Sequence, residues 1–282
     1  MILKDKVSII TGGSRGIGKA IATAFAKEGS NLILVARTMS ELEATKREIE
    51  SLSATRVEIF RGDVSQPREV KELVEFSLKE FASVDILVNC AGVPGPIGLT
   101  CDIDTEKWLE TLLINLYGTF LCIKAVFPIM IKNKRGKIIN FSGGGAVSPR
   151  PRFSAYSASK GAVVRLTETL AEEVKEYNIC INAISPGAVN TKMLDAVLEA
   201  GEAAGEELVK AIKQKQEGGT PPERAAELSL FLASSKSDGL TGRLISAVWD
   251  NWREIPQHLN EIMASDIHTS RRITPKDRGY NW

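Results

Sequence analysis

A tyrosine and a lysine four positions apart could together perform acid–base chemistry. Tyr156 and Lys160 fall near the start of a helical pattern over residues 155–175. Both side chains therefore lie on one helix face, about 5–6 Å apart at Cβ. A phenol has a pKa of about 10, too high for ready proton exchange at neutral pH, but a neighbouring ammonium group favours the phenolate and lowers that pKa. The pair predicts that Tyr156 is a general acid–base.

A glycine-rich segment near the N-terminus is typical of a phosphate-binding loop. Residues 11–18 read TGGSRGIG and lie between an apolar strand pattern and a helical pattern. Glycines let the backbone turn sharply and approach a ligand closely. The following helix N-terminus offers N–H groups and partial positive charge to a pyrophosphate. The residues predicted to bind it are Gly12, Ser14, Arg15, Gly16, Ile17 and Gly18.

Two arginines favour a cofactor that carries a 2′-phosphate. The second strand pattern ends in Ala36 and Arg37, where a site that prefers NAD places an acid for the ribose 2′-hydroxyl. Arg37 and Arg15 can instead clamp a phosphate through charge-assisted hydrogen bonds. We therefore predict NADP(H) over NAD(H). The alternative is that Arg37 is a solvated loop charge.

Four motifs occur in order along the chain: TGGSRGIG at 11–18, NCAG at 89–92, YSASK at 156–160 and PG at 186–187. With these motifs the sequence resembles the short-chain dehydrogenase/reductase family, in its one-domain branch, and is similar to 3-oxoacyl-ACP reductases and related ketoreductases. The resemblance implies an NADP(H)-dependent oxidoreductase that interconverts a carbonyl and a secondary alcohol. The substrate would be a small molecule.

The resemblance also implies a role for each matching position. Tyr156 would exchange a proton with the substrate oxygen, and Lys160 would bind the nicotinamide ribose while lowering the tyrosine pKa. Asn115 would support a water-linked proton path to that lysine. Thr191 would lie near the nicotinamide carboxamide, with a helix N-cap as its alternative role. The other cofactor positions would be Asp63 and Val64 at the adenine, Asn89, Ala91 and Gly92 on the adenosine side, and Pro186, Gly187 and Val189 around the nicotinamide.

One position departs from the family pattern. The family usually has a serine thirteen residues before the tyrosine, where its hydroxyl orients the substrate carbonyl, and here that position is Gly143. We expect the glycines at 143–145 to let the loop shift by one residue and bring Ser142 into the site. Ser148 and Ser154 are alternatives. Gly143 also motivates a competing hypothesis, an NADP(H)-binding module of the same fold without catalytic activity.

Substrate identity stays open. A sugar or polyol dehydrogenase fits the same motifs as a 3-oxoacyl reductase. A nucleotide-sugar epimerase fits less well, because that branch uses a TGxxGxxG spacing and a separate substrate domain. The mixed charge of residues 191–222 and the cationic, aromatic C-terminal segment do not choose among an acyl carrier, a sugar and an acid. Trp249 and Trp252 could line the substrate mouth, form an oligomer contact or simply pack as part of the C-terminal tail.

Short apolar runs alternate with helical periodicity along the chain, which is typical of a parallel sheet covered on both faces. The alternation predicts a doubly wound, Rossmann-like α/β fold: a seven-stranded parallel sheet with helices on both faces. We expect a single dinucleotide-binding and catalytic domain over residues 1–250. The seven runs are Val7–Thr11, Leu32–Ala36, Val57–Phe60, Ile86–Asn89, Ile138–Phe141, Ile179–Ser185 and Leu244–Val248.

Three segments stand outside this alternation. Leu112–Ile131 is long enough to cross a bilayer, but Lys124 near its middle would cost roughly 2.5–3.5 kcal/mol there. We therefore predict a helix buried against protein, with a subunit interface as one location. Residues 191–222, bounded by Gly and Pro, predict a lid-like insertion. Residues 251–282 predict a C-terminal extension that packs on the domain or on a neighbouring subunit.

The composition argues against several classes of function. Among 282 residues, 36 Lys plus Arg face 35 Asp plus Glu, a formal net charge of +1. This balance provides no field that would attract nucleic acid or an anionic membrane, so we expect neither as partner. The four cysteines form no CxxC pair and the two histidines lie near the C-terminus, which predicts no metal site and a cytoplasmic protein. By resemblance, and from two long apolar helical patterns, we expect a homodimer or homotetramer.

Overall fold

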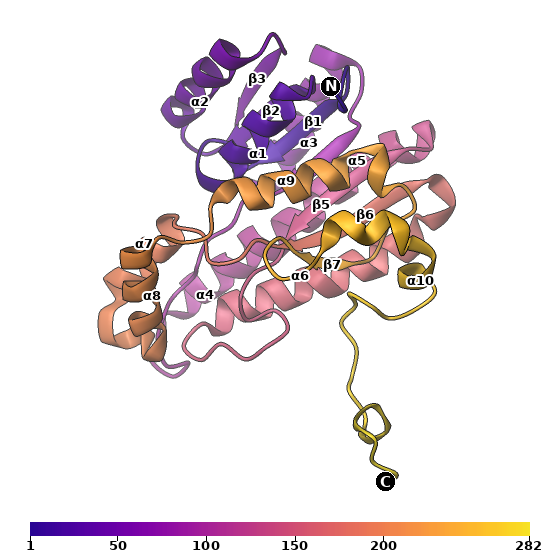
Figure 1. Ribbon diagram of the computed structural model, residues 1–282. Helices are drawn as coiled ribbons and strands as arrows, with labels where there is room; N and C mark the ends of the chain where they lie inside the picture. The colour runs from indigo at the N-terminus through magenta and orange to yellow at the C-terminus, as the bar shows by residue number, and fades with distance from the viewer.

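The computed structural model describes residues 1–282, and its centre is one parallel sheet (Figure 1). The strand order is β3-β2-β1-β4-β5-β6-β7, so the chain builds outward from β1 to one edge and then fills the other. The predicted doubly wound α/β fold is confirmed. The strands are β1 (Val7–Thr11), β2 (Asn31–Ala36), β3 (Val57–Arg61), β4 (Ile86–Asn89), β5 (Gly136–Phe141), β6 (Ile179–Ser185) and β7 (Leu244–Ser246).

Helices cover both faces of the sheet because both faces of its strands are apolar. Ile10 and Leu34 pack into one core, and their neighbours Ile9 and Ile33 pack into the other. This alternation is the two-residue period of a strand. The first core is covered by α1 (Gly16–Lys27), α2 (Met39–Leu52) and α9 (Pro222–Ala233), and the second by α3 (Pro67–Phe81), α5 (Gly118–Asn133) and α6 (Ser154–Glu173).

One long helical segment on the second face carries a candidate site residue. The helix α4 (Thr105–Leu112), a π-helical turn η1 (Leu113–Tyr117) and α5 run continuously over Thr105–Asn133. By length and composition alone this segment could cross a membrane, but 44% of its most apolar window is buried inside the protein. The α5 part packs against α3, β4 and β5. Asn115 lies in the π-helical turn and is fully buried.

The insertion between β6 and α9 forms a small helical layer beside the sheet, at the left of Figure 1. It contains α7 (Lys192–Ala200), a short turn η3 (Gly201–Ala204) and α8 (Glu206–Glu217). Leu194 and Val197 of α7 pack with Phe153 and Tyr156 in a third, smaller apolar cluster. The insertion therefore lies directly against the start of α6, where the tyrosine is.

The C-terminal extension is attached along its first part only. It contains η5 (Trp252–Gln257), α10 (Leu259–Met263) and η6 (Pro275–Arg278); the remaining short turns are η2 (Lys175–Tyr177) and η4 (Ser235–Ser237). Trp252 packs on Phe231 of α9 with ring centroids 5.5 Å apart. The backbone of Ser270 still bonds to α6, through Arg165 and Glu168. Beyond this point the chain extends away from the body (Figure 1).

Candidate active site

The glycine loop between β1 and α1 leaves space that no side chain could share. Gly12 and Gly16 have φ values of +68° and +53°, a conformation that favours glycine. A Cβ placed on Gly18 would lie 2.2 Å from the carbonyl oxygen of Gly12. The helix α1 begins at Gly16 with no side-chain hydrogen bond to its first N–H groups. These groups face the loop and fit a phosphate.

A cavity of about 480 Å³ opens over this loop at the carboxyl ends of β1, β2 and β4. This is the crevice beside the point where strand order reverses. Asn89 is a predicted cofactor residue that does not line it: its buried amide donates to Asn140 and ties β4 to β5. The predicted residues that do line it are Gly12, Ser14, Arg15, Gly16, Ile17, Gly18, Arg37, Asp63, Val64, Ala91, Gly92 and Thr191.

Glu41, which no sequence motif indicated, lies among the charged side chains that line this cavity. Glu41, on α2, pairs with Arg15 at 3.0 Å and with Lys192 at 3.4 Å, and accepts a hydrogen bond from Ser14. Burial raises the pKa of Glu41, but the Ser14 hydrogen bond and the two cations outweigh it and leave the pKa below its ordinary value. The second predicted cation, Arg37, lies 3.9 Å from Asp63.

These residues fit a nicotinamide dinucleotide. The loop backbone and the uncapped helix N-terminus would hold the pyrophosphate. Asp63 and Val64 line the part of the cavity beside β3, and Ala91 and Gly92 line the part beside β4. Thr191 lines this cavity and also caps α7, accepting a hydrogen bond from the backbone of Met193. Its two alternative roles are therefore compatible.

Tyr156, Lys160 and Asn115 converge from two helices. The Lys160 Nζ lies 5.9 Å from the Tyr156 ring centroid and donates to the carbonyl oxygen of Phe141 at 2.8 Å. The Asn115 side chain donates to the Val93 carbonyl and to the Ser159 hydroxyl, and accepts from the Val93 backbone N–H. Lys160 and Asn115 line neither the cofactor cavity nor the cavity in front of Tyr156. Both lie next to Gly92: a Cβ there would be 3.2 Å from the Asn115 Oδ1 and 3.5 Å from the Lys160 Nζ.

Burial, not the lysine, dominates the protonation of the tyrosine. It raises the pKa of Tyr156 to about 12, and the positive charge of Arg150 only partly opposes that rise. Burial also lowers the pKa of Lys160 to about 8. The expectation that Lys160 depresses the tyrosine pKa is therefore wrong for this structure, because desolvation disfavours the charged form of both groups. At neutral pH the phenol holds its proton.

The departure at Gly143 has a geometric cause. A Cβ on Gly143 would lie 2.3 Å from the Tyr156 hydroxyl, so the phenol already occupies the place of a side chain there. Ser142 does not replace it. Its Oγ is buried without a hydrogen-bond partner and lines neither the cofactor cavity nor the cavity in front of Tyr156. Ser142 and Gly143 follow β5 directly, and adjacent residues of a strand point to opposite faces. Ser148 is exposed, and Ser154 accepts a hydrogen bond from Trp108; neither lines the cavity at Tyr156.

A second cavity of about 480 Å³ lies in front of Tyr156. It shares Ile17, Thr191 and Met193 with the cofactor cavity, so the two cavities join into one cleft. The residues that line the first cavity form the cofactor wall of this cleft, and those that line the second form its substrate wall. Pro186, Gly187 and Val189, which the resemblance places around the nicotinamide, line this second cavity and not the cofactor cavity. Side chains that no motif indicated line it too: Arg150, Glu207, Lys210 and Gln214.

The two C-terminal tryptophans separate. Trp249 is 85% exposed and lines the substrate-side cavity, whereas Trp252 is buried under α9. Trp249 therefore lies at the mouth of the substrate-side cavity. Trp252 instead packs against Phe231 and has the guanidinium of Arg253 above its ring.

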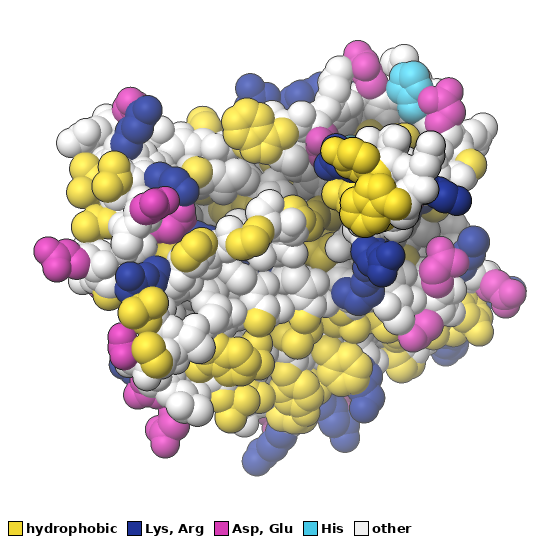
Figure 2. Space-filling model, turned by 90° about the horizontal axis from the view of Figure 1, so that it is seen from below, with side chains coloured by type: hydrophobic (Ala, Val, Ile, Leu, Met, Phe, Trp, Pro, Cys, Tyr) yellow, Lys and Arg dark blue, Asp and Glu magenta, His cyan; other side chains and the backbone are white.

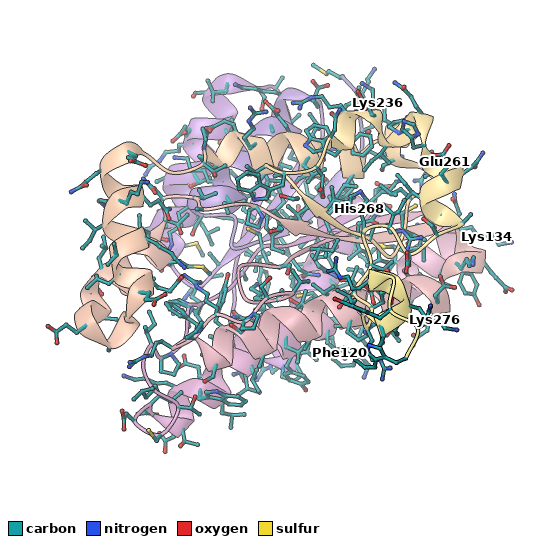
Figure 3. The ribbon with its side chains drawn as sticks, turned by 60° about the horizontal axis from the view of Figure 1, so that its bottom comes forward. Phe120, Lys134, Lys236, Glu261, His268 and Lys276 are labelled. Carbon is teal, nitrogen blue, oxygen red and sulfur yellow. The ribbon has the colours of Figure 1, made fainter.

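The histidines lie away from both cavities. His258 contacts Glu261 at 3.2 Å, and His268 lies 3.5 Å from Asp250. In Figure 3, Glu261 lies at the outer edge and His268 nearer the centre. The structure contains no group of three or more His, Cys, Asp or Glu side chains arranged to hold a metal ion. The acid–base groups of the cleft are those around Tyr156.

Known proteins match the chain along most of its length. A family described as short chain dehydrogenase matches residues 6–202. The chain is 34% identical over 245 residues to the 3-oxoacyl-(acyl-carrier-protein) reductase of Thermotoga maritima, with 87% of this chain and 97% of that protein covered. The structure of NAD⁺-bound xylitol dehydrogenase superposes with a TM-score of 0.82 at 27% identity, covering 87% and 98% of the two chains. The structure of an actinorhodin polyketide ketoreductase with NADPH superposes with a TM-score of 0.80 at 29% identity, covering 86% of this chain and 95% of that chain.

Proposed function

We propose a specific reaction for this chain, which belongs to the short-chain dehydrogenase family of oxidoreductases that act on carbonyl and alcohol groups. It reduces a ketone to a secondary alcohol, or the reverse, with Tyr156 as the general acid–base. A bound nicotinamide supplies or accepts the hydride. The protein orients the substrate and exchanges the proton.

One observation carries this proposal: the Tyr156 side chain lines a cavity that shares three residues with the cofactor cavity. Ile17, Thr191 and Met193 form walls of both. A carbonyl group in the second cavity would have the phenol on one side and the nicotinamide position on the other. Proximity of this kind is what hydride and proton transfer to one carbonyl require.

The protonation state of Tyr156 suits the reduction direction. With its pKa raised to about 12, the phenol is protonated at neutral pH, so a proton is present for transfer to a developing alkoxide, which is the stronger base. Lys160, whose pKa is lowered to about 8, still carries its charge for most of the time at pH 7. Its hydrogen bond to the Phe141 carbonyl holds the ammonium next to Gly92, which lines the cofactor cavity.

We propose NADP(H) as the preferred cofactor. Arg15 and Arg37 both line the cofactor cavity and provide two cations for a 2′-phosphate. Glu41 already pairs with Arg15, so the phosphate would have to share that cation or displace the carboxylate. The test is the ratio of kcat/KM for NADPH and NADH. A ratio well above one supports the assignment, and a preference for NADH would contradict it.

The decisive experiment for the reaction is Tyr156→Phe. We expect the variant to lose at least a thousandfold in kcat while it binds NADPH as tightly as the wild-type protein, because only the acidic proton is removed. Tyr177→Phe is the matched control, since Tyr177 lies outside both cavities. Full turnover by Tyr156→Phe would rule out this acid–base.

A second candidate function is favoured by Gly143, which leaves the family's serine position without a hydroxyl. In that case the protein binds NADPH and regulates or scaffolds rather than catalyses. The wild-type protein would then bind NADPH but oxidise it with no ketone in a broad panel. This alternative is ruled out if the wild-type protein reduces any ketone and the Tyr156→Phe substitution abolishes that reduction.

We also propose that the chain acts as a homo-oligomer in the cytoplasm. Its four cysteines are all free, as suits a reducing compartment. Leu109, Leu113 and Tyr117 are 53%, 40% and 37% exposed along α4 and η1, and Figure 2 shows apolar side chains gathered on the face seen from below. Light scattering should give a dimer or tetramer mass that Leu113→Glu lowers. A monomeric wild-type protein would contradict the oligomer.

A further inference from the structure

An ion pair lies inside the substrate-side cavity, between the loop before α6 and the helix α8. The Nε of Arg150 donates to one carboxylate oxygen of Glu207 at 2.7 Å, and Lys210 donates to the other at 2.7 Å. All three side chains line the cavity that holds Tyr156. Two cations and one carboxylate leave one positive charge unbalanced there.

The guanidinium of Arg150 is held in place by stacking and by missing side chains. Its central carbon lies 3.9 Å from the Phe153 ring centroid and 6.0 Å from that of Tyr156. A Cβ on Gly144 would be 4.0 Å from the Arg150 Nη1, and one on Gly145 only 3.2 Å from its Cβ. Glycine at 145 therefore leaves room for this arginine, whereas a methyl group on Gly144 would only touch the guanidinium.

Arg150 has binding capacity left over. A guanidinium offers five N–H donors, and only the Nε of Arg150 has a hydrogen-bond partner in the structure. The planar group pairs with carboxylates through two parallel hydrogen bonds. Glu207 shows that a carboxylate already fits against this arginine, and Lys210 would retain Glu207 when a second anion arrives.

We propose that Arg150 binds a carboxylate of the substrate, so that the substrate class is a small oxo acid and its hydroxy acid. This deepens the proposed reaction and rests on it, because Tyr156 fixes where the reacting oxygen lies. The spacing of Arg150 and Tyr156 places the carboxylate within a few bonds of that oxygen. The chemistry is a two-electron reduction of the ketone: the carbon gains hydride, the oxygen gains the phenol proton, and the carboxylate is unchanged.

The test compares each oxo acid with its own methyl ester, which removes the negative charge and adds one methyl group. We use 2-oxo and 3-oxo acids, acetoacetate and methyl acetoacetate among them, with NADPH. The wild-type protein should show a kcat/KM at least tenfold higher for one acid than for its ester. This comparison needs no variant, so it does not depend on any variant folding.

Three variants then locate the effect. Arg150→Gln should lower kcat/KM for the acid about a hundredfold, mainly through KM, and change the ester less than threefold. Arg150→Lys should recover part of the loss. Lys213→Gln is the matched control on α8, because Lys213 is exposed and pairs only with Glu217; it should leave both substrates unchanged.

The outcomes separate this proposal from the one on which it rests. If esters are reduced as well as acids, the reaction stands and the carboxylate subsite falls. An Arg150→Gln variant that loses acid and ester equally would also overturn the subsite, since the arginine would then serve the loop. If NADPH binds and no ketone of either kind is reduced, the proposed reaction itself fails, and this inference fails with it.

Discussion

The two walls of the cleft are built in different ways. The cofactor wall follows mostly from the strands: most of its loops leave β1 to β4 at their carboxyl ends, and five of its residues are glycines. The substrate wall draws on three remote segments, the loop before α6, the helices α7 and α8, and Trp249 after β7. The fold positions the first wall, and individual side chains define the second.

This difference predicts different kinds of damage. Changes in the cofactor wall meet backbone that cannot move, so they should weaken binding of any dinucleotide. Changes in the substrate wall meet side chains rather than backbone, so they should alter selectivity and leave dinucleotide binding intact. Each wall contains a glycine that tests this: a methyl group added at Gly18 would meet backbone, and one added at Gly144 would have free space around it.

The largest contrast is expected between Gly18→Ala and Gly144→Ala. The Gly18 methyl would lie 2.2 Å from the backbone oxygen of Gly12, whereas the Gly144 methyl has no neighbour closer than 4.0 Å. Overpacking costs roughly 1–3 kcal/mol, so Gly18→Ala should raise the Kd for NADPH about tenfold to a hundredfold. Gly144→Ala should leave it unchanged. Fluorescence titration with NADPH measures both, and equal affinities would erase the proposed difference between the walls.

Lys160 is buried beside Gly92 of the cofactor wall, and this burial should be visible in the free energy of unfolding. Its pKa is about 8 in the folded protein against 10.5 ordinarily. Between these values the unfolded chain holds more protons, so the free energy of unfolding gains from rising pH across that window. The gain relative to Lys160→Met should be roughly 2 kcal/mol from pH 7.5 to 10. Urea unfolding at several pH values checks this; parallel profiles for the two proteins would show that the ammonium is not desolvated.

The sheet and the cofactor wall are predictable from the sequence for one reason. Buried parallel strands are continuous apolar runs, and the residues that follow them meet at one edge of the sheet. The bounds differ most at two runs: β5 begins at Gly136, two residues before its predicted run, and β7 ends at Ser246, two residues before the predicted Val248. The glycine loop is therefore placed by its position after a strand, without any knowledge of side-chain contacts, whereas Asp63 and Gly92 are indicated by the family resemblance.

The substrate wall is not predictable in this way. Arg150 and Glu207 are 57 positions apart, and no periodicity relates them. The interpretation of Ser142 follows the family spacing but neglects strand alternation, which turns its hydroxyl away from the cavity. For Tyr156, the spacing indicates a nearby cation, whereas the degree of burial that raises its pKa exists only in the folded chain.

A smaller effect should sharpen the cofactor preference. Glu41→Gln removes the carboxylate that pairs with Arg15 and Lys192, and a 2′-phosphate would no longer compete with it. A pair exposed this far is worth about 1 kcal/mol or less, so the Kd for NADPH should fall by up to about fivefold. The Kd for NADH should not change. Glu43→Gln, an exposed neighbour on α2, is the control; a parallel gain for both cofactors would place Glu41 outside the 2′-phosphate site.

The smallest effect is expected at the far end of the substrate side, where the extension leaves the body. Arg271 pairs with Asp277 and Thr274 caps the same short turn, so residues 273–282 make their hydrogen bonds within the extension itself. Ile273, Tyr280 and Trp282 are 59%, 57% and 86% exposed. Removing residues 273–282 should therefore change the free energy of unfolding by less than about 0.5 kcal/mol. A larger loss in thermal unfolding, together with a lower oligomer mass, would show that these side chains are buried against a second copy of the chain.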